Sequence, residues 1–445
     1  MKKRKTNSSK IEKRTEMRYI FLIIAIAFLS PAWAQKSLSL QDAISIALEN
    51  NYDIQLSKQK VKSAEIRNNW GTVGAYPSFS LMFASNNDIN DVDPEDYTRN
   101  QLMGDAKIRW TIFDGFSIRS NKHRLNELEN LSKGNLAVLI ENTVQSVILA
   151  YNNVLLQSEK LNVLKQSMEL SEDRFKRAET QKELGAAVTY EVLQAKNAYL
   201  ADKASFLLQE VTYKNAKRNL KFLLGNSTKE IVEVNGKLDV VASTYQLKNL
   251  LEKMHMDNSN LKNQYLNIAL LQRDVAIAKS DYYPTLSLSA GASNNHMKFN
   301  YDKKADVTND SWQYYGNLTL SYTLFNGGNR KRAVQLAKLE EESGNITLDQ
   351  VKHSLDNQLL NLYDFHSARK ALLEVATENL AAAELNLQIS SEKLKSGAIN
   401  SFNYRDVQLI YVNAAQRKLE AVYNLIDSQT SLLRITGGII QEYQK

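Results

Sequence analysis

Residues 38–81 read LSLQDAISIALENNYDIQLSKQKVKSAEIRNNWGTVGAYPSFSL, and residues 245–288 read YQLKNLLEKMHMDNSNLKNQYLNIALLQRDVAIAKSDYYPTLSL. The two stretches align without a gap, and this alignment places Pro77 on Pro284. In both stretches a long helical pattern precedes the proline, and a pattern of period two follows it. The same arrangement of elements therefore occurs twice in one chain.

The repeat continues beyond these stretches. WTIFDG at 110–115 aligns with YTLFNG at 322–327, and the offset of 212 residues then persists almost to the end of the chain. A repeat of about 210 residues is far too long for a solenoid unit. We therefore divide the mature chain into two structurally equivalent halves, 35–236 and 237–445.

The composition favours long helices. The 445 residues include only 4 prolines and 16 glycines, too few for a sandwich of many short strands and turns. Cysteine is absent, so disulfides, thiolate metal sites, cysteine nucleophiles and a lipidated N-terminal cysteine are excluded.

The first 34 residues resemble a secretory signal. Basic residues precede an apolar run of ten, Ile20 to Leu29, which is too short to span a bilayer, and Ala32-Trp33-Ala34 predicts cleavage before Gln35. This segment holds eight of the 56 basic and two of the 49 acidic residues. The mature chain therefore has 48 basic and 47 acidic residues, a balance that gives no reason to expect nucleic acid as a partner.

Each half is predicted to contain one helix before the proline, from Gln41 to Trp70 and from Gln246 to Lys279. Two strands follow in each half, in which apolar and polar residues alternate. The four strands are predicted at about 77–87, 104–114, 285–295 and 316–326.

The alternation allows two interpretations. Each segment is roughly 11 residues long, which suits a tilted strand that crosses an outer membrane. An antiparallel sheet packed on helices in water would show the same pattern. Four strands cannot close a barrel, and an open edge is not tolerated in lipid, so the membrane interpretation requires several copies: two would give 8 strands and three would give 12.

Helical patterns follow each strand pair. We expect helical hairpins at about 116–225 and 328–437, each with a long first helix of roughly 100 Å. Apolar residues recur every seventh position, which favours supercoiling of neighbouring helices. The glycines Gly185 and Gly397 are predicted to form the hairpin tips.

Several of these motifs resemble the TolC-type outer-membrane efflux family. They are the junctions AYPSFSL and YYPTLSL, the strand ends FDGF and FNGG, and the hairpin tips ELGAAVTYEVLQA and KSGAINSFNYRDVQ. The resemblance implies a mainly α fold with a membrane β part, the TolC-like α/β-barrel, in which two tandem repeats each supply two strands and long coiled-coil helices. It further implies a homotrimer with a 12-stranded barrel in outer-membrane lipid and a helical tunnel through the periplasm of a Gram-negative bacterium.

The resemblance also implies a function. The expected protein is the outer-membrane channel of a tripartite efflux or type I secretion system, a passive conduit without enzymatic activity. Its expected partners are a periplasmic adaptor (membrane fusion) protein and an inner-membrane transporter, with no cofactor.

The family often carries acidic residues six and nine positions after the second tip glycine. Those positions here are Asn403 and Asp406, and the equivalent first-half positions are Glu191 and Gln194. In a three-fold assembly each inward side chain occurs three times, so these residues are expected to form a periplasmic constriction. Ordinary solvated positions on an outer helix face are the alternative.

The adaptor is expected to dock on the hairpin tips. The tip residues are Leu184, Gly185, Ala186, Ala187, Ser396, Gly397, Ala398 and Ile399. Residues that only form a turn would look the same. Lys107 and Arg109, on the polar side of a strand, are candidates for the barrel lumen, with a position near the loop as the alternative.

Searches for catalytic and metal-binding motifs are negative. The five histidines show no ligand spacing, and the chain contains no Walker loop and no GxSxG elbow. The competing hypothesis is a soluble periplasmic coiled-coil scaffold or adaptor protein. The two hypotheses differ in whether the apolar strand faces lie under helices or remain uncovered.

Overall fold

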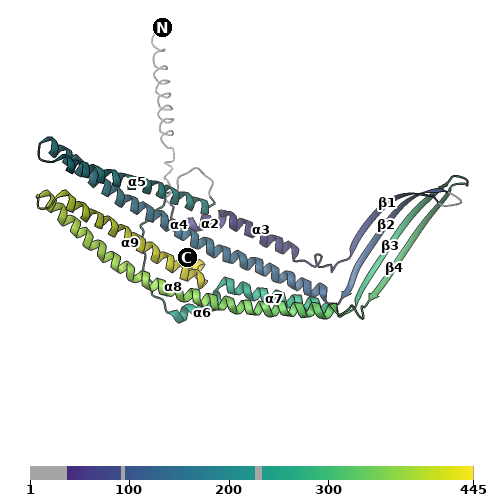
Figure 1. Ribbon diagram of the computed structural model, residues 1–445. Helices are drawn as coiled ribbons and strands as arrows, with labels where there is room; N and C mark the ends of the chain where they lie inside the picture. Colours follow the sequence, from purple (N-terminus) through teal and green to yellow (C-terminus); the bar gives the residue numbers. More distant parts are fainter. Residues whose placement is uncertain (1–37, 92–95, 226–232, 444–445) are drawn as a thin grey trace, which may run out of the picture.

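The computed structural model describes residues 38–91, 96–225 and 233–443, so the predicted signal segment lies outside the described residues. A four-stranded sheet forms one end of the molecule, and two helical hairpins extend away from it to the other end (Figure 1). The elements in chain order are α2 (Leu40–Asn50), α3 (Tyr52–Arg67), β1 (Ser78–Asn90), β2 (Tyr97–Asp114), α4 (Ser117–Glu183), α5 (Thr189–Leu223), α6 (Leu247–Asp257), α7 (Ser259–Ser280), β3 (Thr285–Tyr301), β4 (Val307–Ser321), α8 (Asn329–Lys395), α9 (Ser401–Ile435) and α10 (Ile439–Tyr443).

The sheet is antiparallel throughout, in the order β1-β2-β3-β4. The strands have 13, 18, 17 and 15 residues and are longer than predicted. Polar residues at their far ends obscured their length in the sequence. The prediction of a strand up to 326 was wrong, because β4 ends at Ser321. Tyr322 and Leu324 continue the alternation but lie beyond the sheet.

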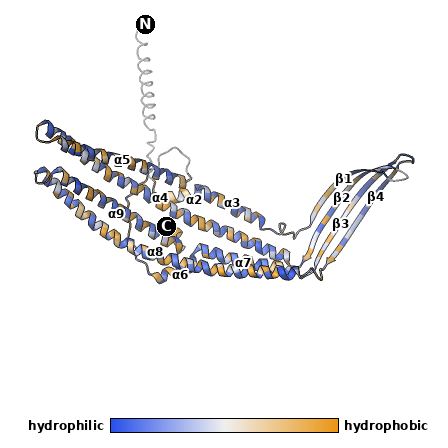
Figure 2. Ribbon diagram, in the orientation of Figure 1, coloured by the Kyte–Doolittle hydropathy of each residue, from blue (hydrophilic) through white to orange (hydrophobic). Residues whose placement is uncertain are grey.

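The two faces of the sheet differ in polarity as the alternation predicted. One face carries Phe79, Leu81 and Phe83 of β1, with exposed fractions of 66%, 62% and 84%. None of the described helices covers this face, because the sheet extends beyond the helical part (Figures 1 and 2). An uncovered apolar face contradicts the interpretation of a sheet packed on helices.

Two glycines in the sheet lie beneath aromatic rings of the adjacent strand. Phe83 is the cross-strand partner of Gly104, and an added Cβ on this glycine would lie 3.3 Å from the ring. Tyr315 is the partner of Gly291, where an added Cβ would lie 2.6 Å from the carbonyl oxygen of Ala106. A ring that covers a glycine restores the packing that the missing side chain would supply.

The helices form one curved layer. In the part far from the sheet, α5, α4, α9 and α8 lie side by side in that order, and nearer the sheet the order is α3, α4, α7 and α8 (Figure 1). The helices α4 and α8 have 67 residues each, which corresponds to about 100 Å. The predicted seven-residue seam is present, since Phe175 of α4 stacks on Tyr199 of α5 with ring centroids 6.2 Å apart.

The predicted single helices before each proline were wrong, because each is two helices. The break falls at Asn51 between α2 and α3, and at Asn258 between α6 and α7. Both asparagines have extended backbone angles, and the side-chain oxygen of each accepts from a backbone N–H of the following helix. An asparagine that caps a helix in this way starts a new helix at an angle to the last one.

The same asparagines attach the ends of the hairpins. The Asn51 side-chain amide donates to the carbonyl oxygen of Leu223 at 2.9 Å, and that of Asn258 donates to Ile435 at 2.8 Å. The accepting carbonyls are at the C-terminal ends of α5 and α9, where helical partners are lacking. In each half, therefore, the same contact joins the break between the two short helices to the end of the hairpin.

Candidate functional site

The two hairpin tips have the same backbone structure. Gly185 and Gly397 have φ angles of 75° and 76°, which glycine adopts without strain. At the first tip Ala186 N–H donates to Gln181 at 2.7 Å, and at the second Ala398 N–H donates to Lys393 at 2.8 Å. These bonds form a Schellman motif that ends each long helix and reverses the chain.

The tip residues are accessible. Leu184 has an exposed fraction of 79%, whereas Ala187 and Ile399 are half-buried, and the remaining tip residues are exposed. An added Cβ at either tip glycine would meet nothing within 4 Å. Both tips lie together at the end of the molecule opposite the sheet (Figure 1).

The four predicted constriction residues lie just beyond the tips, in the first two turns of α5 and α9, and all are exposed. The Gln194 side-chain amide donates to the hydroxyl of Tyr190 at 2.7 Å, and Asn403 N–H donates to the Asn400 side chain at 2.9 Å. None of the described contacts joins Glu191, Gln194, Asn403 or Asp406 to one another. The single chain does not bring these four residues together.

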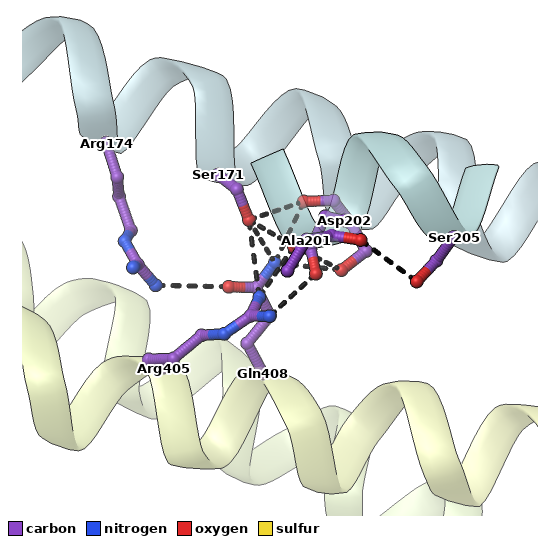
Figure 3. A network of polar contacts seen from close by, with 8 residues as sticks. Ser171, Arg174, Ala201, Asp202, Ser205, Arg405 and Gln408 are labelled. Carbon is purple, nitrogen blue, oxygen red and sulfur yellow. Dashed lines mark hydrogen bonds and ion pairs between the residues drawn. The ribbon is translucent and has the colours of Figure 1, made fainter. Parts of the chain in front are cut away.

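A polar cluster that the sequence analysis missed lies further from the tips and connects the two hairpins (Figure 3). We call it the inter-hairpin network. Its members are Ser167, Ser171 and Arg174 of α4, Asp202 of α5, and Arg405 and Gln408 of α9.

An ion pair forms the centre of the inter-hairpin network. Arg405 donates from two guanidinium nitrogens to the two carboxylate oxygens of Asp202, both at 2.6 Å. The side chains have exposed fractions of only 16% and 11%. Ser167 donates to the same carboxylate at 3.2 Å, and Ser171 also donates to it. A bidentate pair with further donors is the arrangement that best offsets the cost of burying the two charges.

Gln408 completes the inter-hairpin network. Its side-chain nitrogen donates to the carbonyl oxygen of Ser167 at 2.9 Å, and its side-chain oxygen accepts from Arg174 at 3.1 Å. Burial and then the charge of Arg405 lower the pKa of Arg174 from its ordinary value. Both causes disfavour the charged form of Arg174. The inter-hairpin network contains two arginines, Arg174 and Arg405, but only one carboxylate, that of Asp202.

The heptad pattern contained a signal for the inter-hairpin network. Three positions after an apolar row of the seam, α5 carries the buried residues Ala195, Asp202 and Ala216, with the half-buried Gln209 between the last two. A buried aspartate in such a row needs a partner on the facing helix. The partner's identity could not be read from the pattern.

Lys107 and Arg109 lie on the polar face of the sheet, opposite the face of Ile108 and Trp110. Lys107 lies between Ser80 of β1 and Gly291 of β3, and Arg109 lies between Ser78 and Ser289. Small neighbours on both sides leave space for these long cationic side chains over the polar face.

In the part of the chain that the structure describes, no group of three or more His, Asp or Glu side chains is arranged to hold a metal ion. His366 is a buried seam residue, whose ring nitrogens lie 3.2 Å from the hydroxyl of Ser428 and 3.0 Å from the carbonyl oxygen of Ser243. Its ring therefore bridges α9 and the segment that precedes α6.

Across residues 38–91, 96–225 and 233–443, no helix combines the length and the apolar character needed to cross a membrane.

Comparisons with known proteins agree with this architecture. The protein-family model described as "Outer membrane efflux protein" matches residues 43–226 and 250–438. The cation efflux system protein CusC of Escherichia coli O157:H7 is 19% identical over 401 residues, which cover 89% of this chain and 85% of CusC. A crystal structure of CusC has a TM-score of 0.73 at 14% identity and covers 90% of this chain and 92% of its own. The CmeC outer-membrane channel of Campylobacter jejuni has a TM-score of 0.72 at 15% identity and covers 94% of both chains.

Proposed function

This chain belongs to the outer membrane efflux protein family, and on that basis we propose that three copies form one passive conduit, docked to partner proteins at its periplasmic end. The protein is an outer-membrane efflux channel of a Gram-negative bacterium, with a large periplasmic part. It has the TolC-like fold of two repeats. The proposal concerns how copies assemble, where partners bind and which residues line the passage.

The observation that carries the proposal is that the sheet is open on both sides. Among the described residues β1 pairs only with β2, and β4 pairs only with β3. An open edge in lipid leaves backbone groups without partners, at several kcal/mol each. Pairing β4 of one copy with β1 of the next removes both edges. A ring made in this way is a head-to-tail assembly, and three copies give the 12 strands of a closed barrel.

The outer helices of the layer support the same assembly. On α5, the apolar residues Leu193, Leu200 and Leu207 recur every seven positions and are about half exposed. On α8, at the opposite edge, Leu339 and Ile346 have exposed fractions of 56% and 66%. Apolar rows of this spacing fit against a neighbouring helix. In the proposed ring, the α8 edge of one copy packs on the α3 and α5 edge of the next.

We assign a role to each group of residues from its position along the molecule. We assign adaptor docking to the tip residues 184–187 and 396–399, which are at the free end of the molecule. We assign the periplasmic constriction to Glu191, Gln194, Asn403 and Asp406, next to the tips. The inner-membrane transporter supplies the energy. Lys107 and Arg109 line the barrel interior, where they favour anions.

The inter-hairpin network holds the two tips of one copy together. It joins α5 of the first hairpin to α9 of the second through buried, charge-assisted bonds. Spreading the tips to widen the constriction separates these groups. We therefore assign the network to the closed arrangement.

Introduced cysteines test the assembly, because the natural chain has none. Ser80→Cys in β1 is combined with single cysteines placed in turn at positions 317–321 of β4. Oxidation of outer membranes should link copies into dimers and trimers for at least one of these pairs. Each single-cysteine chain serves as its control. If every pair stays monomeric, or if the protein is recovered from the soluble periplasm, the proposed ring is wrong.

Reconstituted channels test the constriction. Glu191→Gln and Asp406→Asn remove exposed charges and should leave thermal stability unchanged, while reducing the preference of the channel for cations. Lys107→Gln should shift the preference in the opposite direction. Unchanged ion selectivity in both acidic variants would contradict the assignment.

A further inference from the structure

Arg330 occupies an unusual environment in the first turn of α8. Its exposed fraction is only 8%. The guanidinium lies over the rings of Tyr282 and Tyr322, at 5.7 and 5.8 Å from their centroids. Arginine often stacks on aromatic rings, and such contacts stabilise the cation when it is desolvated.

The charge of Arg330 has no carboxylate partner among the described residues. Its Nη2 atom is buried and has no hydrogen-bond partner, and none of the described carboxylates forms an ion pair with it. Leaving a buried cationic donor without an acceptor is costly. The two covering rings are themselves about half exposed, at 46% for Tyr282 and 53% for Tyr322. The rings that cover the guanidinium therefore lie at the molecular surface.

The surroundings of Arg330 add positive charge. Lys331 and Arg332 follow it and are exposed. The helix begins after Gly328, and the side-chain oxygen of Asn326 accepts from the Arg330 N–H at 3.4 Å. This neutral cap brings no negative charge to the positive end of the helix dipole. The two second-half segments at this junction, 279–284 and 326–332, hold four lysines and arginines against one aspartate.

The first half of the chain lacks this feature at the equivalent place. The position of Arg330 is taken by Ile118, whose N–H donates to the carboxylate of Asp114 at 2.7 Å. The second half has the neutral Asn326 instead of that aspartate. The buried arginine without a partner is therefore specific to the second junction, and the shared fold does not require it.

The neighbours of Arg330 indicate the class of ligand. The loop between β4 and α8 carries Leu324 and Phe325, which are 86% and 82% exposed in the single chain and lie at the edge that faces the next copy in the proposed ring. This loop follows the apolar part of β4 and precedes the periplasmic helices. A ligand at this level meets an apolar surface on the side of the sheet and cations on the side of the helices. Phospholipids combine an acyl chain with a phosphate in the same order.

We propose that Arg330, Lys331 and Arg332 bind the phosphate of an anionic phospholipid in the periplasmic leaflet, with its acyl chains along Leu324 and Phe325. This inference rests on the proposed outer-membrane channel. The phosphate oxygens supply the acceptor that Arg330 Nη2 lacks among the residues that the structure describes. Arginine suits this role because its fork binds phosphate through two parallel bonds. The lipid would then fasten the barrel to the helical part of the second half.

Native mass spectrometry of the full-length assembly in detergent tests this site. Phosphatidylglycerol is titrated against the natural protein, Arg330→Gln and the double variant Lys331→Gln/Arg332→Gln. The double variant changes only exposed side chains and covers the case in which Arg330→Gln fails to fold. Each removed charge should lower the affinity for phosphatidylglycerol about fivefold. Arg119→Gln, at the first-half position that corresponds to Lys331, should leave lipid binding unchanged.

Three results would overturn the site. Unchanged phosphatidylglycerol binding in both test variants excludes it, and an equal loss in Arg119→Gln shows nonspecific attraction to a basic surface. Complete displacement of the lipid by millimolar inorganic phosphate indicates a site for a free anion. The same spectra give the mass of the assembly. A trimer without selective lipid binding contradicts this inference alone, whereas the absence of a trimer contradicts the proposed function.

Discussion

The two halves of the chain share one backbone but differ in the polar contacts that their side chains make. The buried asparagine contacts and both tips are duplicated almost bond for bond. The inter-hairpin network is not. The second-half counterpart of Asp202 is Ala414, and that of Ser171 is Ala383, and both alanines are buried. The contacts shared by the halves therefore hold each repeat together, whereas the unshared ones mark places where the halves have different tasks.

The largest expected effect comes from breaking the unshared network. Asp202→Ala leaves Arg405 and Arg174 buried without a carboxylate, and should lower the free energy of unfolding by about 3 kcal/mol. Chemical denaturation of the purified protein in detergent measures this loss. The double variant Asp202→Ala/Arg405→Leu should recover part of it, because no unpaired arginine remains at the centre. Equal stability of Asp202→Ala and the natural protein would show that the network carries no structural load.

The second-largest expected loss of stability distinguishes a glycine packed against another segment, Gly225, from a glycine at a hairpin tip, Gly185. Gly225 has a φ of 65°, and an added Cβ would lie 2.1 Å from the carbonyl oxygen of Asn50. Gly225→Ala should destabilise by more than about 2 kcal/mol, since the clash adds to the cost of the left-handed backbone. At Gly185, where nothing lies within 4 Å, the backbone cost alone applies, about 1 kcal/mol. Thermal unfolding of both variants gives the ranking, and a reversed order would contradict the docking of α5 against the α2 end.

Removing either of the two shared asparagine contacts should lower the stability of the protein by the same amount. Asn51→Ala and Asn258→Ala each remove a helix cap and a bond to the end of the returning helix, so each should cost about 1–2 kcal/mol. Denaturant midpoints of the two variants compare the halves directly. A large difference between them would mean that the repeats are equivalent in geometry but not in stability.

The smallest effect depends on pH. Glu141 is buried in the first half, whereas its second-half counterpart His353 is exposed. Burial raises the pKa of the Glu141 carboxyl from its ordinary value, although Ser259 donates to it at 2.6 Å. The folded chain therefore holds this proton more tightly than the unfolded chain. Stability is lost as the pH rises from the unfolded pKa of 4.5 through the raised folded value.

Replacing the acid tests this direction. Glu141→Gln keeps an oxygen that accepts from Ser259 and carries no charge, so it should stabilise the protein at pH 7 and have no effect at pH 4. Melting temperatures at the two pH values measure the difference. Stabilisation of equal size at both would show that the cause is packing and not ionisation.

Particular residues show which features of the fold could be predicted from the sequence and which could not. The alternation of Phe79, Leu81 and Phe83 with polar residues was enough to predict a strand and its two faces. The far ends of the strands were missed, because residues such as Asn100 and Lys298 carry no apolar alternation and are held in the sheet only by their cross-strand neighbours. The end of β4 was also missed, since Tyr322 continues the alternation after pairing has stopped.

The candidate sites divide in the same way. The tip glycines could be placed because a Schellman turn is local and depends on a few consecutive residues. Asp202 and Arg405 could not be paired, because they are 203 residues apart and meet only through the packing of α4 against α9. Arg330 is comparable, since its rings come from two separate segments.

The sequence by itself determined the duplication, the helical and strand periods, the amphipathic strand faces and the turns at the tips. These features depend on local spacing, and local spacing follows from backbone geometry. Only the tertiary structure decided which polar side chains meet, how far each strand extends and where a buried charge lacks a partner. Those features depend on distances between remote segments, and such distances are set when the helices and strands of both halves pack together.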